Sequence, residues 1–362
     1  MPRILRHPTP FMNARILLVI VSCALSVVTG LVLSRGGGPA KASRSRPLIG
    51  LSMDTLKEER WQSDRDMFVA RAEALGADVK VLAANSDDTR QLTDVDALIT
   101  SGVDSIVIIP HNGAAMAKAV EKANAAGIPV LSYDRLITGC DLDLYMTFDN
   151  VKVGELQAKF LGDRLPAGRK MRLIRIYGSK TDNNAFLFKQ GQDNILQPLI
   201  DSGKVEVVHE DWTEDWKPEN AKKIANAAIT KAGRDFDAIL SSNDGTAGGA
   251  IQALIEEGLA GKVLVTGQDA DLAACQRIVH GAQTMTVYKP IKNLANQAAE
   301  IAVKLAQRKP IIARAELDNG KVKVRSIFLD IVAVTKENME ETVIKDGFLK
   351  KADVFQGGDA KP

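Results

Sequence analysis

Residues 105–133 read SIVIIPHNGAAMAKAVEKANAAGIPVLSY, and this stretch decides the fold class. The apolar runs at its two ends, 105–109 and 129–133, lack the alternation of polar and apolar residues that a half-exposed strand shows. Uninterrupted apolar strands are typical of parallel sheets that are covered on both faces. The residues between them, 114–126, have the spacing of an amphipathic helix. A strand, a helix and a second strand in this order predict one unit of a parallel α/β sheet.

The same alternation continues in both directions from this stretch. Before it, the patterns predict strands at 48–53 and 79–83 and helices at 64–75 and 92–101. A second series begins after Phe148, and two such series predict two doubly wound α/β lobes. Its strands are expected at 171–177, 205–209, 238–242, 263–267, 284–288 and near 327–334, and its helices at 152–165, 185–202, 219–231, 247–257, 272–280 and 291–307.

Length and composition fit this organisation. The chain has 362 residues, enough for two domains, and its 45% apolar and 25% charged residues are ordinary for a soluble globular protein. Residues 1–42 contain five of the 47 basic residues and none of the 45 acidic ones, so the remainder is slightly acidic. A body with this charge lacks the basic surface that nucleic-acid binders need.

The N-terminal segment predicts export. Residues 16–33, ILLVIVSCALSVVTGLVL, follow a basic stretch and precede the pattern Ala40-Lys41-Ala42, which predicts a signal peptide at 1–42 that is cleaved after Ala42. Two alternatives stay open. The apolar run is long enough to remain as a membrane anchor, and the residues up to Cys23 resemble a lipidation box. All three interpretations place the folded body in the periplasm, outside the cytoplasm.

The cysteines do not indicate a disulfide scaffold. The chain has three, without a C-x-x-C pair. In an oxidising compartment a bridge between Cys140 and Cys275 stays open. Their wide separation in sequence favours two separate thiols.

Polar side chains come directly after several of the expected strands. A doubly wound sheet binds its ligand at this place, beyond the carboxyl ends of its strands. Asp or Asn in such a place is commonly a helix cap. Arg60, Arg135 and Lys289 cannot have that role, which favours a ligand site. The residues in question are Arg60, Trp61, Asp134, Arg135, Asn184, Asn243, Asp269 and Lys289.

This chemistry suits a neutral polyol. A sugar hydroxyl both donates and accepts, carboxylates accept, and Arg and Lys donate. Such charge-assisted bonds contribute about 1.5–3 kcal/mol each. Trp61, Trp212 and Trp216 offer flat apolar faces for a sugar ring, with core packing as the alternative for each. Trp216 lies in a polar stretch between a strand and a helix, which favours a position in the site.

Catalytic motifs are missing from the sequence. It contains no G-x-S-x-G, no G-x-x-x-x-G-K-[ST] and no H-x-x-x-H. Asp134 and Asp269 could form the carboxylate pair of a glycoside hydrolase. However, Arg135 and Lys289 nearby would keep both ionised and leave no general acid. The sequence therefore predicts no enzyme activity, no metal and no cofactor.

Several longer stretches resemble the periplasmic sugar-binding proteins of the ribose/galactose type, which serve ABC importers. The resemblance extends from about residue 49 to residue 348. Its most specific parts are ERWQSDRD at 59–66, VLSYDR at 130–135, TFDNVKVGELQA at 147–158, SNDGTAGGAIQAL at 242–254, GQDADL at 267–272 and QTMTVYKP at 283–290.

The resemblance implies the type I periplasmic binding fold, with two lobes joined by three crossover strands. The crossovers are expected near Asp149–Val151, Lys289–Ile291 and Leu329–Val332. The sugar-binding lobe one is then expected at 46–149 plus 291–329, and lobe two at 150–290 plus 330–356.

The resemblance also implies roles for individual residues. His111 departs from the family, which usually has Tyr before the Asn-Gly that follows it. By their positions, Arg60 and Trp61 match a sugar-contacting loop after the first strand, and Asp134 and Arg135 match a pair that binds adjacent hydroxyls. Asn184 matches an amide of lobe two, and Trp216 matches its stacking tryptophan. The remaining hydroxyl partners are matched by Asn243, Asp269 and Lys289.

The function implied by the resemblance is capture of a monosaccharide, with D-xylose as the expected pentose, and its delivery to the membrane permease of an ABC transporter. One alternative is a sugar-sensing receptor that reports to a chemoreceptor or another membrane signalling protein. The ligand domain of a transcription regulator is disfavoured, because an export signal stands where the DNA-binding helices would be.

Overall fold

The structure is a computed structural model and describes residues 45–356. The expected signal peptide, the alternative anchor at 16–33 and Cys23 lie outside the described residues. Within 45–356, no helix is long and apolar enough to cross a membrane. The chain separates into residues 1–45 and residues 46–362, and the fold described below belongs to the second unit.

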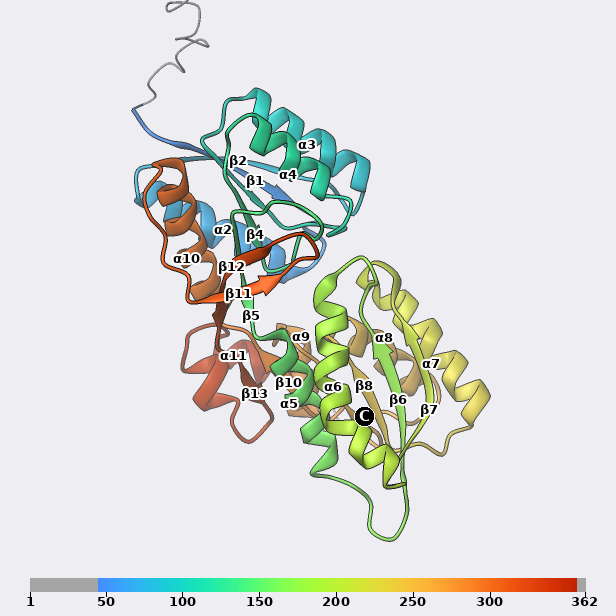
Figure 1. The fold of residues 1–362 in the computed structure, drawn as a ribbon. Helices are drawn as coiled ribbons and strands as arrows, with labels where there is room; N and C mark the ends of the chain where they lie inside the picture. Colours follow the sequence, from blue (N-terminus) through green and yellow to red (C-terminus); the bar gives the residue numbers. More distant parts are fainter. Residues whose placement is uncertain (1–44, 357–362) are drawn as a thin grey trace, which may run out of the picture. The chain divides into compact units, whose positions relative to one another are not determined.

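The first sheet has seven strands in the order β11-β12-β5-β4-β3-β1-β2 (Figure 1). All neighbours are parallel except β11, which pairs with β12 in the antiparallel direction at the edge. The strands are β1 (Leu48–Met53), β2 (Asp78–Ala83), β3 (Ser105–Ile108), β4 (Val130–Tyr133), β5 (Leu144–Phe148), β11 (Ala315–Asp318) and β12 (Lys323–Leu329).

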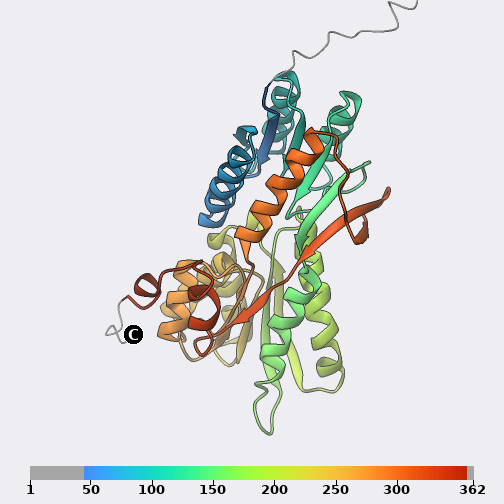
Figure 2. The ribbon, with the colours of Figure 1, turned by 90° about the vertical axis from the view of Figure 1, so that its left-hand side faces the viewer.

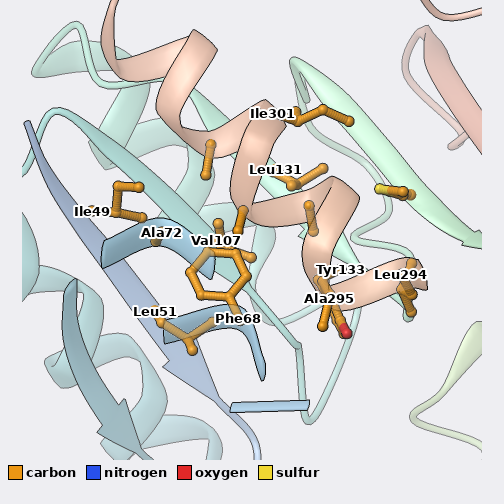
Figure 3. Close-up of a cluster of buried hydrophobic side chains, with 14 of the residues drawn as sticks. Ile49, Leu51, Phe68, Ala72, Val107, Leu131, Tyr133, Leu294, Ala295 and Ile301 are labelled. Atoms are coloured by element: carbon orange, nitrogen blue, oxygen red, sulfur yellow. The ribbon is translucent and has the colours of Figure 1, made fainter. Parts of the chain in front are cut away.

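Helices cover both faces of this sheet. On one face lie α2 (Glu59–Ala74) and α10 (Ile291–Ala306), which share an apolar cluster with the sheet; α3 (Asp88–Thr100) and α4 (Ala117–Ala125) belong to the other cluster. Both faces are therefore shielded from solvent, which explains the uninterrupted apolar strands. Figure 3 shows the first cluster, in which Phe68 and Ala72 of α2 and Leu294, Ala295 and Ile301 of α10 lie over Ile49, Leu51, Val107 and Leu131.

The second sheet has four parallel strands in the order β7-β6-β8-β9. One apolar cluster joins it to α5 and α6, and another joins it to α7 and α8. The elements are β6 (Met171–Tyr177), β7 (Val205–Trp212), β8 (Ala238–Ser241), β9 (Leu264–Val265), α5 (Asn150–Gly162), α6 (Asn183–Asp201), α7 (Pro218–Ala232), α8 (Asp244–Glu256) and α9 (Leu272–His280). The predicted fold class, α/β with two doubly wound lobes, is confirmed.

Three short connections join the two groups of elements. β5 ends at Phe148 and α5 begins at Asn150, while β10 (Thr286–Tyr288) is followed by α10. The third connection runs from β12 into β13 (Val332–Val334), which pairs with β10 (Figure 2). Lobe one and lobe two denote the two groups of elements with the boundaries expected from the sequence. These boundaries stay a prediction, and the division of the strands between the two larger sheets agrees with them.

Helices α5 and α6 touch backbone to backbone. A Cβ on Gly154 of α5 would lie 2.0 Å from the carbonyl oxygen of Phe188, and one on Gly191 of α6 would lie 1.9 Å from that of Val151. Only glycine allows this approach at either position.

Three elements differ from the sequence prediction. Strand β5 was not expected; it pairs with the preceding strand β4 and with β12, which comes from a distant part of the chain. Helix α2 begins at Glu59 instead of residue 64, since Glu58 makes no side-chain cap that would mark its start. The expected strand 327–334 is two strands, because β12 and β13 belong to different sheets.

Cys140 and Cys275 are free thiols, as the sequence favoured. Both are buried, and they lie in two separate apolar clusters. The alternative of a bridge between them is wrong for this structure.

Candidate ligand-binding site

A cavity of about 260 Å³ lies where elements of both lobes meet. Every predicted site residue lines it, whereas Trp212, a further candidate for a sugar face, packs against Tyr177 and Phe186 outside it. The predicted site residues are Arg60, Trp61, Asp134, Arg135, Asn184, Trp216, Asn243, Asp269 and Lys289.

Arg60 links three carboxylates. Helix α2 carries it in its first turn rather than in a loop, so the expected loop position of Arg60 and Trp61 is corrected. Its Nε lies 3.2 Å from Asp64 Oδ2, its Nη1 lies 3.3 Å from Asp269 Oδ1, and its Nη2 bonds to Asp134 Oδ2. Asp269 belongs to lobe two, so this buried guanidinium also joins the lobes.

The carboxylates around Arg60 differ in their affinity for protons. Burial opposes ionisation of Asp134, but the Arg60 guanidinium and the Lys289 ammonium outweigh it and hold the pKa of Asp134 below its usual range. Burial raises the pKa of Asp64 to about 6, although Arg60 opposes this shift. Asp134 therefore stays a hydrogen-bond acceptor at neutral pH.

Asp134 sits on a strained turn at the end of β4. Its φ is 60°, in the left-handed region that a non-glycine residue adopts at a cost. Three donors hold its carbonyl oxygen, namely Tyr145 Oη at 3.0 Å, Thr147 Oγ1 at 2.7 Å and Asn184 Nδ2 at 3.0 Å. These bonds fix the direction of the turn and hence of the carboxylate.

Arg135 forms the second bridge between the lobes. Its Nη1 donates to Asp54 Oδ2 at 2.7 Å, and its Nε lies 3.0 Å from Asp182 Oδ2 in lobe two. Trp61 packs beside both arginines, with the guanidinium carbon of Arg60 at 4.3 Å and that of Arg135 at 5.2 Å from its ring centroid. Trp61 is only 4% exposed, so it both packs in the core and supports the arginines.

The Asn184 amide is occupied by protein groups. Its Nδ2 donates to Asp134 O, its Oδ1 accepts from Asn150 Nδ2 at 2.9 Å, and that oxygen also lies 3.2 Å from Tyr145 Oη. The sequence predicts a sugar-binding amide here, and Asn184 does line the cavity. In the structure its amide also ties α6 to the turn at Asp134.

Trp216 combines the two roles that the sequence left open. It is 8% exposed and lines the cavity, and its ring also packs edge-on against Phe188 with centroids 6.3 Å apart. Its Nε1 donates to Asp182 Oδ2 at 3.2 Å. Both Asp215 and Trp216 have left-handed backbone, with φ values of 52° and 57°. Gly178 makes room for the ring, because a Cβ there would lie 2.0 Å from it.

Asn243, Asp269 and Lys289 complete the lobe-two and hinge side. Asn243 caps α8, accepting from Thr246 N at 2.9 Å through Oδ1, which leaves its amide NH₂ group to the cavity. Lys289 is 2% exposed, and its Nζ lies 3.0 Å from Asp269 Oδ1. A buried ammonium at a strand end, paired with a carboxylate, is a fixed donor.

Nine residues of the cavity lining were not among the predicted site residues, and three of these have polar groups that bear on ligand binding. Asp182 contacts both Arg135 and Trp216. Among the described residues, Glu58 Oε2 and Gln268 Oε1 are buried oxygens without a hydrogen-bond partner, and both side chains line the cavity. Asp182 and Gln268 follow strands β6 and β9, so the strand-end rule could have found them.

The cavity is lined by charges of both signs. Its four cations, Lys57, Arg60, Arg135 and Lys289, each pair with a carboxylate, and six carboxylates line the cavity in all. In the range 45–356, no group of three or more His, Cys, Asp or Glu side chains could hold a metal ion. The arrangement is suited to a neutral ligand with many hydroxyl groups.

Comparison with known proteins identifies the class. Residues 49–310 match the family described as the periplasmic binding protein domain, and the chain belongs to this family of substrate-binding proteins. It is 49% identical to the D-xylose-binding periplasmic protein of Haemophilus influenzae, covering 93% of this chain and 99% of that protein. It is 48% identical to the protein of the same name from Escherichia coli, covering 92% and 99%.

A solved structure supports the same class. The carbohydrate transporter solute-binding protein of Chloroflexus aurantiacus, in complex with D-glucose, has a TM-score of 0.81 and 34% identity. The match covers 86% of this chain and 98% of that one.

Proposed function

We propose that the protein binds one molecule of a pentose, D-xylose, in the periplasm and delivers it to the membrane permease of an ABC importer. The observation that carries this proposal is the convergence of the site residues on one cavity that holds paired charges of both signs. The two relatives named for D-xylose binding support the choice of sugar.

The cavity provides donors and acceptors in the alternation that sugar hydroxyls need. Arg135, Lys289 and the Asn243 amide donate, while the carboxylates of Asp134 and Asp269 accept. Each donor is held by other protein groups, so little side-chain freedom is lost when the sugar binds. Trp216 covers an apolar face of the sugar ring.

We further propose that the site performs no chemical step on the sugar. Asp134, with its lowered pKa, is ionised at neutral pH and cannot act as a general acid. Asp269 forms ion pairs with Arg60 and Lys289. Carboxylates of this kind are hydrogen-bond acceptors rather than a hydrolytic pair.

Contacts between the lobes would make delivery depend on the ligand. The Gly113 N–H donates to Thr181 O at 3.1 Å, and the Arg135–Asp182 and Arg60–Asp269 pairs lie close to the cavity. Rotation about the three hinge connections would separate these pairs and open the site. A sugar that bridges both walls favours the closed arrangement, which the permease can then recognise.

Calorimetric titration of the purified protein with D-xylose, D-ribose, L-arabinose, D-glucose and xylitol tests the proposal. We expect one site, with D-xylose bound most tightly. Lys289→Met should weaken binding by about 10- to 150-fold, because it removes a charge-assisted donor. The matched control Lys292→Met changes an exposed lysine of α10 and should leave affinity unchanged. Absence of D-xylose binding would overturn the proposed ligand, and equal affinities in the two variants would remove Lys289 from the site.

A further inference from the structure

His111 lies between two carboxylates that belong to different lobes. It follows β3 in lobe one, and its Nδ1 is 2.7 Å from Asp88 Oδ1, at the start of α3. Its Nε2 is 3.4 Å from Asp215 Oδ1, in the segment of lobe two that precedes Trp216. The ring is 12% exposed and does not line the cavity.

The position of the ring is fixed from the lobe-one side. The backbone N–H of His111 donates to Gln91 Oε1 at 2.9 Å. Asp88 is held in turn, because Asn112 Nδ2 donates to its Oδ2 at 3.0 Å. His111 therefore presents Nε2 to lobe two whether or not Asp215 is close.

A neutral imidazole cannot satisfy both carboxylates. It carries one N–H, so if Nδ1 donates to Asp88, then Nε2 is an acceptor that faces the acceptor Asp215 Oδ1. The doubly protonated ring donates to both. Closing the lobes thus brings a second carboxylate to a ring that gains from a second proton.

The other charged groups around the His111 ring permit a second proton on it but make that proton less favourable. Lys217 Nζ lies 2.8 Å from Asp215 Oδ2, and Lys57 Nζ lies 3.5 Å from the Asp215 carbonyl oxygen. Burial opposes ionisation of Asp215, but the bonds from Lys217 and His111 outweigh it and lower its pKa, so it is charged whenever histidine titrates. The two ammonium groups repel an imidazolium and keep the net gain modest.

From this geometry we propose that His111 is a positioning residue that couples proton uptake to lobe closure, by holding the Asp215–Trp216 segment over the sugar. The left-handed backbone of Asp215 and Trp216 needs such an external restraint, because the segment is strained on its own. The inference rests on the proposed function and adds a pH dependence to it.

The test is the number of protons taken up when D-xylose binds near pH 6.5. Calorimetry in two buffers with different ionisation enthalpies measures it. We expect the wild type to take up more protons than His111→Gln, and its affinity to fall by about two- to five-fold more between pH 5.5 and pH 8. His280→Gln, which changes an exposed histidine at the end of α9, is the matched control and should behave as the wild type.

Asp64 and Asp244 also titrate in this range, but they are present in both proteins, so the difference isolates His111. Asp215→Asn, which leaves the His111–Asp88 contact in place, should lose the same proton uptake. Equal uptake in wild type and His111→Gln would overturn the inference and leave the proposed function intact. If D-xylose does not bind, the proposed ligand fails, and the same comparison is made with the polyol of the panel that does bind.

Discussion

The two walls of the cavity are built by different physical means. The lobe-one wall is held by ion pairs, in which Arg60 and Arg135 each contact at least two carboxylates. The lobe-two wall is held by shape, since the Trp216 ring fits over a glycine and its backbone is left-handed. Removing a charge should therefore disrupt the lobe-one wall, whereas adding a methyl group should disrupt the lobe-two wall.

The largest effect is expected from Arg60→Met. It leaves Asp64, Asp134 and Asp269 without their shared cation, and uncompensated buried charge typically costs about 3–5 kcal/mol. The free energy of unfolding should fall by this amount, and sugar binding should be lost. Urea denaturation and calorimetry measure the two effects.

Arg65→Met on the same helix is the control for this comparison. Arg65 pairs with Asp66, whose side chain is 67% exposed, and such pairs contribute less than about 1 kcal/mol. If the two variants unfold alike, the lobe-one wall does not depend on its ion pairs.

A smaller effect is expected from Gly178→Ala, which tests the lobe-two wall. The new methyl group would overlap the Trp216 ring and push it into or away from the cavity. Affinity for D-xylose should fall by about tenfold or more, or about 1.4 kcal/mol, while the charges of the site stay unchanged. Gly245→Ala also changes a cavity glycine, but its nearest contact would be 3.6 Å, so its affinity should stay within about twofold. Equal affinities in the two variants would show that the Trp216 ring has space to move.

A further effect, a change of about 2–3 kcal/mol in the free energy of unfolding between pH 5 and pH 8, concerns the pH dependence of stability behind the lobe-two wall. Burial raises the pKa of Asp244 to about 7, from about 4 in an unfolded chain. The folded state then holds the proton more tightly, so this stabilisation is complete below about pH 4 and is lost as pH rises to about 7.

Asp244→Asn should make the free energy of unfolding vary less between pH 5 and pH 8, as urea denaturation at both values would show. Asp66→Asn is the control, because the hydrogen bond from Arg65 lowers the pKa of Asp66 and keeps it ionised throughout this range. If Asp244→Asn does not alter how the free energy of unfolding changes with pH, the pH dependence comes from other groups, such as Asp64.

The location of the site was predictable from sequence, whereas its internal contacts were not. The strand-end rule brought Asp134, Asn243 and Asp269 to one cavity because the carboxyl ends of parallel strands share an edge. The Arg60–Asp269 pair joins residues 209 positions apart, and no local pattern indicates it. Likewise, the use of the Asn184 amide depends on partners from β5 and α5, of which the strand was not predicted.

The backbone contact between α5 and α6 has a mechanical consequence. Helix α5 starts at a hinge connection, and α6 starts one residue before Asn184, beside the cavity. Because Gly154 and Gly191 leave no space between the two helices, they cannot slide past each other without collision. The two helices are therefore expected to move as one rigid body when the chain rotates at residues 149–150, and Asn184 moves with them because its Oδ1 accepts from Asn150 Nδ2 at 2.9 Å. An alanine at either glycine would force the two helices apart, and residues 149–150 would then be coupled less tightly to the cavity.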